Sequence, residues 1–271
     1  MNGLSEAEIR TYRDDGVLFP FPVLSDAELA AALAVVDRID TFPAEQRAGL
    51  LLARTHWVSK TLCDLCRNPR ILDRVEGLIG PNILVWGANF FLKEPRSPAY
   101  VGWHQDATYW GLEPADIVTA WVALTPSTVE SGCMRVAPGT HRGGIVDHVE
   151  TWQPDNLLSR GQEIAVEVDQ DTVVDVVLRP GEMSLHHVKI AHNSEPNRAS
   201  HRRIGFAIRY VAAHVRQGSG ARDLAMQVRG EDRWNYFEHD EGAKGEFLPE
   251  DVARHAEAWA AGRRALAKQA G

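Results

Sequence analysis

A histidine and an aspartate separated by one residue, His104 and Asp106, form the pair in this sequence best suited to chemistry. In an extended strand, side chains two residues apart project from the same face, so this imidazole and carboxylate would converge on one point. A second histidine would complete the two-histidine, one-carboxylate facial triad of non-haem iron(II) oxygenases. The pair alone is weak evidence, because the chain contains 11 histidines.

Two histidines farther along the chain compete for the third position. His192 ends an apolar run and precedes the turn-forming residues Asn193 and Ser194. His186 lies on the same face as His192 if the strand between them runs unbroken. Three protein ligands on one face of an iron ion would leave the opposite positions open for a cosubstrate and for dioxygen.

An arginine pair opens the next β-prone run, which extends from Arg203 to Tyr210. A guanidinium presents a planar fork of donors that suits bidentate binding of a carboxylate. Strand alternation directs only one of Arg202 and Arg203 to the interior. The small residues Gly205 and Ala207 share the parity of Arg203, which favours Arg203 for a crowded barrel interior.

Several ordered motifs together resemble the phytanoyl-CoA dioxygenase family of Fe(II)- and 2-oxoglutarate-dependent oxygenases, which includes ectoine hydroxylase. The matching motifs are Asp14-Asp15-Gly16-Val17, Trp103 to Asp106, Pro138-Gly139-Thr140-His141, Pro180-Gly181-Glu182 and His192 to Arg203. With Tyr210 as its far end, the resemblance covers most of the chain. It implies a double-stranded β-helix, the cupin-like jelly roll.

The resemblance also implies roles for individual residues. His104, Asp106 and His192 would bind Fe(II), with His192 preferred to His186. Arg203 would hold the distal carboxylate of 2-oxoglutarate, and O2 would complete the reactants. His141, in its Pro-Gly turn, is expected to be structural.

Further cosubstrate contacts follow from the same resemblance. Ser194 and Lys93 would approach 2-oxoglutarate, although a lysine at a strand end is usually solvated. Trp110 resembles the aromatic residue that walls the site in ectoine hydroxylase. Related halogenases carry a small residue in place of Asp106, so an aspartate here favours hydroxylation.

The substrate is less constrained by the sequence. The formal net charge of −8 argues against nucleic acid and against a phosphate-rich substrate such as an acyl-CoA. We therefore expect a small polar or zwitterionic metabolite. Candidate contacts are Arg209 on a strand and Asn156, Arg160 and Gln162 in the irregular segment 143–171, which is a candidate lid.

The elements that must position these residues change character near residue 82. Capping boxes at Ser5 and Ser25 predict helices before that point, and Pro43 is expected to end the second helical region. Further helices are expected at 58–66, 71–79 and 249–268, and extended runs at 17–23, 83–93, 118–124, 134–137, 164–168, 173–178, 183–190 and 204–211. This order predicts a mainly β protein with flanking helices.

Composition predicts one domain over residues 1–271, with a helical flank at about 1–81, a jelly-roll core at about 82–215 and a helical tail at about 245–271. Hydrophobic residues make up 44% of the chain and charged residues 24%, as in globular proteins. No apolar run is long enough to span a bilayer, and no secretory signal is evident. Three cysteines, including the pair Cys63 and Cys66, are expected to be small buried residues in a reducing cytoplasm.

Two other functions remain open at this point. A cupin-like metal-dependent isomerase or lyase would need the triad but not Arg203. A non-catalytic sensor would bind 2-oxoglutarate or metal without consuming the cosubstrate. The tail helix is expected to pack outside the sheet or to form a contact in a homodimer, and the chain to act as a monomer or homodimer.

Overall fold

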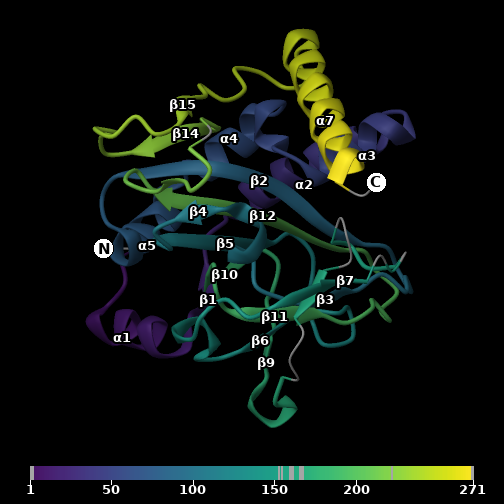
Figure 1. Cartoon of the computed structure of the whole chain (residues 1–271). Coiled ribbons are helices and arrows are strands. Elements are labelled where there is room, and N and C mark those ends of the chain that lie inside the picture. The colour runs from purple at the N-terminus through teal and green to yellow at the C-terminus, as the bar shows by residue number, and fades with distance from the viewer. Residues whose placement is uncertain are drawn as a thin grey trace.

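Two mainly antiparallel β-sheets form the centre of the computed structural model, which describes residues 3–151, 153, 155–158, 162–164, 168–220 and 222–269. The larger sheet has the strand order β1-β10-β5-β12-β2-β14-β15 and the smaller has the order β3-β11-β6-β9. Figure 1 shows helices above the larger sheet and the smaller sheet below it. Each face of the larger sheet therefore meets a different layer.

The strands and helices have the following bounds. The larger sheet contains β1 (Val17–Pro22), β2 (Ile83–Lys93), β5 (Ile117–Ala123), β10 (Glu182–His187), β12 (Arg203–Ala212), β14 (Leu224–Arg229) and β15 (Glu238–His239), and the smaller contains β3 (Val101–His104), β6 (Met134–Ala137), β9 (Val174–Val176) and β11 (Ala191–Ser194). Two further pairs are β4 (Leu112–Glu113) with β13 (Arg216–Gln217) and β7 (His148–Glu150) with β8 (Gln162–Ile164). The helices are α1 (Glu6–Asp15), α2 (Asp26–Asp40), α3 (Ala44–Leu52), α4 (Lys60–Cys66), α5 (Pro69–Ile79), α6 (Ala107–Trp110) and α7 (Pro249–Gln269), with short 3₁₀ turns η1 (Thr55–Trp57), η2 (Thr140–Arg142) and η3 (Gln170–Thr172).

Both predicted capping boxes are present and begin α1 and α2. The Ser5 side chain accepts a hydrogen bond from the Glu8 amide, and the Glu8 carboxylate accepts one from the Ser5 amide at 2.7 Å. Ser25 and Glu28 repeat this arrangement. Each box satisfies amide groups that would otherwise lack a partner in the first helical turn.

Strand alternation divides the larger sheet between two cores. On β12, Ile204, Phe206 and Ile208 point toward the helices and join residues of α2, α4 and α5 in the main hydrophobic core. Ala207, on the opposite face, packs between the sheets with residues such as Val136 of β6. The mainly β fold with flanking helices is confirmed, and the architecture is a jelly roll.

Several element boundaries differ from those predicted. Pro43 does not end the helical region; it is the N-cap of α3, because a proline at a helix start forfeits no intrahelical hydrogen bond. The predicted strand 183–190 ends earlier, as β10 at His187, and a turn at 188–190 leads to β11 in the other sheet. Of the predicted run 164–168, Ile164 is the last residue of β8, and residues 165–167 lie outside the described part. The predicted run 173–178 is shorter in the structure, where it forms β9.

The predicted tail helix exists as α7, and it packs on α3 and η1. Cys63 and Cys66 are buried in α4 and unpaired, as expected for small core residues. Among the described residues, no helix combines the length and apolar character needed to cross a bilayer.

The tight contact between β12 and β5 yields a stability prediction. A Cβ added at Gly205 would lie 1.8 Å from Cζ2 of Trp121, whereas one added at Gly87 would meet nothing closer than an Arg209 side-chain nitrogen at 4.0 Å. Overpacking of a filled core costs about 1–3 kcal/mol, so Gly205→Ala should lower the free energy of unfolding by at least this amount. Gly87→Ala is the matched control and should be neutral or slightly stabilising, since glycine is unfavourable inside a strand. Denaturant unfolding measures both, and equal stabilities of the two variants would contradict the packing described here.

Candidate active site

His104 and His192 face each other across the smaller sheet. They are register partners in the antiparallel pair β3 and β11, and their ring centroids lie 4.1 Å apart. Nδ1 of His104 is 2.9 Å from the Gly102 carbonyl, and Nδ1 of His192 is 3.0 Å from the Ile190 carbonyl. A carbonyl only accepts, so each Nδ1 carries the proton and each Nε2 presents a lone pair to the space between the rings.

Asp106 reaches the same point by a route that the sequence did not predict. Strand β3 ends at His104, and Asp106 has helical backbone angles as the N-cap of α6. A turn, not strand alternation, therefore brings its Oδ1 to 3.5 Å from Nε2 of His104. Gln105 holds this turn: its side-chain amide donates to the Lys189 carbonyl at 2.7 Å and accepts from the Val146 amide at 2.9 Å.

His192 and Asp106 have the protonation states that a metal site needs. Burial, with a smaller contribution from the neighbouring His104, lowers the pKa of His192 to about 3. Burial alone would raise the pKa of Asp106, but the adjacent His104 imidazole and nearby cationic groups such as Arg209 hold it below its usual value. Near neutral pH the site thus offers a neutral His192 imidazole and an ionised Asp106 carboxylate.

The donor atoms converge closely enough to hold one metal ion. One ligand atom each from His104, Asp106 and His192 lie within 4.8 Å of one another, and no other such group of three or more occurs among the residues that the structure describes. Two imidazoles and a carboxylate with anchored ring orientations fit a non-haem iron(II) site. His186 lines the same cavity, with its ring 5.1 Å from that of His192, but it does not belong to the converging group.

Arg203 lies deep in this cavity without an acidic partner. It is 2% exposed, and its Cζ lies 5.1 Å from the centre of the Trp121 ring. Within the described part of the chain it forms no ion pair, and its Nε has no hydrogen-bond partner. Burial lowers its pKa to about 10, which still leaves a full positive charge near neutral pH. Arg202 points outward and pairs with Asp40 at 2.6 Å, so the alternation prediction is confirmed.

Lys93 is the register partner of Arg203 and is buried, not solvated as is usual for a strand-end lysine. Its Nζ donates to the Ser194 hydroxyl at 2.7 Å and to the Ser194 carbonyl at 3.1 Å, and it also contacts the Glu195 carbonyl. Burial lowers the pKa of Lys93 to about 6, and the positive charge of Arg203 acts in the same direction. The position holds because carbonyl and hydroxyl oxygens replace the lost water.

The remaining predicted residues lie at varying distances from this cavity. Arg209 lines it, whereas Trp110 lines a neighbouring cavity and packs against Arg209, with the Arg209 Cζ 5.2 Å from its ring centre. Asn156 is buried, but its Oδ1 is 3.1 Å from the Leu158 amide and its side chain does not line the cavity. Arg160 lies outside the described residues, and of Gln162 only the backbone, in β8, is described. His141 contacts the Arg13 carbonyl at 3.1 Å, away from the triad.

Further cavity residues that were not singled out from the sequence are Phe91, Val101, Thr119, Trp121 and Met134. Phe91 lies two residues before Lys93 on β2, so strand alternation could have predicted that both face the cavity. Thr119 and Trp121 face Arg209 and Ala207 across β5 and β12, which only the register reveals. The cavity that they enclose with the triad is about 40 Å³, so its walls are closely packed.

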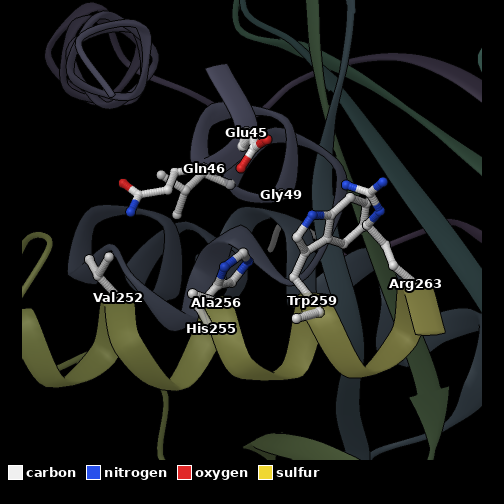
Figure 2. A pocket seen from close by; sticks show the side chains of 10 residues that line it. Glu45, Gln46, Gly49, Val252, His255, Ala256, Trp259 and Arg263 are labelled. Atoms are coloured by element: carbon white, nitrogen blue, oxygen red, sulfur yellow. The ribbon is translucent and has the colours of Figure 1, made fainter. Parts of the chain in front are cut away.

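A larger crevice of about 500 Å³ lies elsewhere, between α3 and α7. Figure 2 shows His255 and Trp259 projecting from α7 toward the helix that carries Glu45 and Gly49. Nε2 of His255 forms a hydrogen bond with the Ala53 carbonyl at 2.5 Å. Among the described residues that line this crevice, no set of metal ligands converges. Chemistry, not volume, therefore identifies the triad cavity as the candidate active site.

The shifted pKa of Lys93 predicts a pH dependence of stability. Unfolded Lys93 keeps its proton up to about pH 10.5, whereas folded Lys93 loses it at about pH 6. Between these values the unfolded state binds more protons, so the free energy of unfolding should rise with pH. Lys93→Met lacks the titrating amine and should not show this rise. The free energy of unfolding of Lys93→Met minus that of wild type should therefore fall as pH increases from 6.5 to 9, by at most about 1.4 kcal/mol per pH unit.

The measurement is denaturant unfolding of the ligand-free protein across that pH range. Lys60→Met is a matched control, because Lys60 is exposed on α4. Its stability difference from wild type should not vary across the range. A pH-independent difference for Lys93→Met as well would show that Lys93 remains protonated in the folded protein.

Comparison with known proteins identifies a family that matches most of the chain and solved structures with the same fold. The family model described as phytanoyl-CoA dioxygenase (PhyH) matches residues 12–205. The chain is 31% identical over 191 residues to a probable alpha-ketoglutarate-dependent hypophosphite dioxygenase of Stutzerimonas stutzeri, covering 67% of this chain and 66% of that protein. It is 30% identical to the peroxisomal phytanoyl-CoA dioxygenase of Homo sapiens, covering 63% of this chain and 53% of that one. The chain thus spans between half and two thirds of the length of these relatives.

Among solved structures, the non-heme monooxygenase ThoJ in its apo form is similar over nearly the whole chain. It shares 32% sequence identity at a TM-score of 0.83, with 96% of this chain and 97% of that chain covered. CytC3, solved with Fe(II) and alpha-ketoglutarate, shares the fold at a TM-score of 0.68. The match over residues 12–205 establishes that the chain belongs to the phytanoyl-CoA dioxygenase family of Fe(II)- and 2-oxoglutarate-dependent oxygenases.

Proposed function

We propose that this protein is a 2-oxoglutarate-dependent dioxygenase that hydroxylates an unactivated C–H bond of a small polar metabolite. The substrate C–H, 2-oxoglutarate and O2 become the alcohol, succinate and CO2, so one oxygen atom enters each organic product. The observation that carries the proposal is the pairing of a facial triad with a buried, unpaired Arg203 in one cavity. A buried arginine without an acid is costly unless a ligand supplies the anion.

The roles of the residues follow from their placement. His104, Asp106 and His192 would hold iron(II), and the bound iron would supply the oxidising chemistry with O2. Arg203 would clamp the distal carboxylate of 2-oxoglutarate, and Ser194 would lie beside it. Lys93 supports this end of the cavity, where an arriving carboxylate would favour protonation of its amine.

The substrate side of the proposal rests on charge and on Asp106. A carboxylate at this position fills a coordination site that related halogenases leave for chloride, which supports hydroxylation. Arg209 is the described polar residue that lines the cavity on the far side from Arg203 and is the best candidate for a substrate contact. A single oxygenase domain acting in the cytoplasm is part of the same proposal.

Two other candidate functions make different demands on Arg203. A cupin-like isomerase or lyase without cosubstrate gives no role to an inward-facing, unpaired guanidinium. A sensor would bind 2-oxoglutarate through Arg203 without producing succinate. The variants and assays below separate all three.

Purified protein supplied with Fe(II), ascorbate and 2-oxoglutarate should release succinate, slowly alone and faster when a substrate from a metabolite panel is present. Arg203→Gln should weaken 2-oxoglutarate binding by about 10–100-fold, the cost of losing charge-assisted hydrogen bonds. Arg202→Gln is the matched control on the same strand, and its binding should stay within about twofold of wild type because its ion pairs face solvent. Succinate is measured by mass spectrometry and binding by calorimetry.

The outcomes discriminate between the candidates. Equal 2-oxoglutarate affinity in the Arg203→Gln and Arg202→Gln variants would favour the isomerase or lyase. Tight cosubstrate binding without succinate under any condition would favour the sensor.

Metal binding gives a separate prediction. Asp106→Ala should weaken Mn(II) binding by at least about tenfold, since one of three protein ligands is removed. His141→Ala removes a buried histidine outside the triad and should leave Mn(II) affinity unchanged. Calorimetric titration of the folded variants tests this, and similar losses in both would argue against the assigned ligand set.

A further inference from the structure

A second cavity adjoins the triad cavity and has an unusual lining. It measures about 220 Å³ and is lined by Arg54, Trp86, Asn89, Trp110 and Arg209, among other residues. Arg209 also lines the triad cavity, so one guanidinium lies on the boundary between the two spaces. We call the second space the outer cavity.

The two tryptophans give the outer cavity an aromatic wall, with their ring planes inclined to each other at 45°. The ring centroids of Trp86 and Trp110 are 5.2 Å apart, and the Arg209 guanidinium packs against Trp110. The indole nitrogen of Trp86 donates to Asp223 at 2.7 Å, which fixes the orientation of that ring. Aromatic side chains of this kind bind planar or apolar parts of a small molecule, and their faces attract cationic groups.

The two arginines of the outer cavity differ in their partners. Arg54 forms an ion pair with Asp223 at 2.6 Å, so its charge is already neutralised. Arg209 has no ion pair among the described residues; its one hydrogen bond is donated to the neutral Asn89 side chain. The anion that acts on Arg209 electrostatically is Asp106, which belongs to the triad. The guanidinium at the boundary is therefore the one with donors and charge still to satisfy.

Counting charges across both cavities leads to the same residue. The lining of the two spaces contributes Arg203, Arg209 and Arg54 as cations but only Asp106 as an anion, with Asp223 paired behind Arg54. Under the proposed function, the distal carboxylate of 2-oxoglutarate neutralises Arg203 and Asp106 serves the metal. Arg209 then remains as a cation facing the space in which a substrate must lie.

The backbone next to Arg209 leaves it room to meet a ligand. Its register partner on β2 is Gly87, which has no side chain to cover the guanidinium. Even an added Cβ there would remain 4.0 Å from the Arg209 side-chain nitrogen. Arg209 lies six positions after Arg203 on β12, about 20 Å of extended strand, so the two arginines enter this face at separate points.

We propose that the outer cavity is the substrate subsite for an anionic group, a carboxylate or a phosphorus oxyanion, which Arg209 binds while Trp86 and Trp110 hold the adjoining apolar part. This inference rests on the proposed function, because it assigns the cosubstrate to Arg203. It narrows the substrate class from polar metabolites to organic anions whose charged end is held at the boundary.

The test uses matched probes with the cosubstrate site already filled. Wild-type protein saturated with Mn(II) and 2-oxoglutarate is titrated with phenylacetate, with neutral phenylacetamide of similar shape, and with phenylphosphonate. Tryptophan fluorescence reports binding, since two indoles line the cavity. At least one anion should bind about tenfold or more tightly than the amide, the value of one charge-assisted interaction. The preferred anion identifies the group that the subsite takes.

Two variants decide whether Arg209 is responsible. Arg209→Gln should abolish the preference for the anion, and Arg209→Lys should keep part of it because the charge remains while the planar fork is lost. Arg216→Gln, an exposed arginine paired with Glu113, is the matched control and should keep the full preference. Circular dichroism and calorimetric 2-oxoglutarate binding verify that each variant is folded.

The contrary results are distinct. Equal affinity of wild type for anion and amide, no detectable binding of any probe, or an unchanged preference in Arg209→Gln would overturn the subsite assignment while leaving the oxygenase proposal intact. Failure of wild type to bind 2-oxoglutarate in the presence of Mn(II) would instead overturn the proposed function, and the subsite assignment with it.

Discussion

The antiparallel register between β3 and β11 is the constraint on which the candidate site depends. It places His192 directly opposite His104, and each ring is held by a hydrogen bond to a carbonyl two residues earlier in its own chain segment. Because side chains alternate along a strand, a slip of one residue would turn one imidazole out of the site. Asp106 then needs only a short turn after β3 to join them. Two strands of four residues each thus define most of the metal-binding geometry.

The larger sheet supplies the other half of the site by the same alternation. On β12 one face is committed to the helical core, while the other carries Arg203, Gly205, Ala207 and Arg209 toward the smaller sheet. Gly205 allows Trp121 to cross that face, and Trp121 in turn provides the aromatic surface beside Arg203. The packing of Trp121 against Gly205 therefore both stabilises the fold and positions Arg203, so a substitution at either residue would affect stability and site geometry together.

Sequence reasoning was most successful where spacing alone carries the information. The capping boxes, the strands 83–93 and 134–137, and the inward direction of Arg203 follow from local pattern and are present in the structure. The reasoning was wrong where tertiary contacts override pattern. The strand geometry assumed for Asp106 is a helical turn held by Gln105. The expectation that Lys93 approaches the site came from the family resemblance, and its burial depends on Ser194 and Glu195, which accept its hydrogen bonds from a segment distant in sequence. Neither contact has a sequence signal, since each joins segments that only the folded sheets bring together.

The buried cation of Arg203 explains why such a cavity should bind anions. Its Nε lacks a hydrogen-bond partner, so the ligand-free protein carries an unfavourably desolvated charge at this end of the site. A ligand that supplies negative charge relieves this penalty and stabilises the folded state by mass action. The desolvation penalty of Arg209 is smaller than that of Arg203. The Arg209 side chain is only half-buried, donates to Asn89 and packs against the Trp110 ring. The cavity is therefore graded along β12, from a fully desolvated cation suited to an obligatory cosubstrate to a partly solvated one suited to exchange of substrate and product.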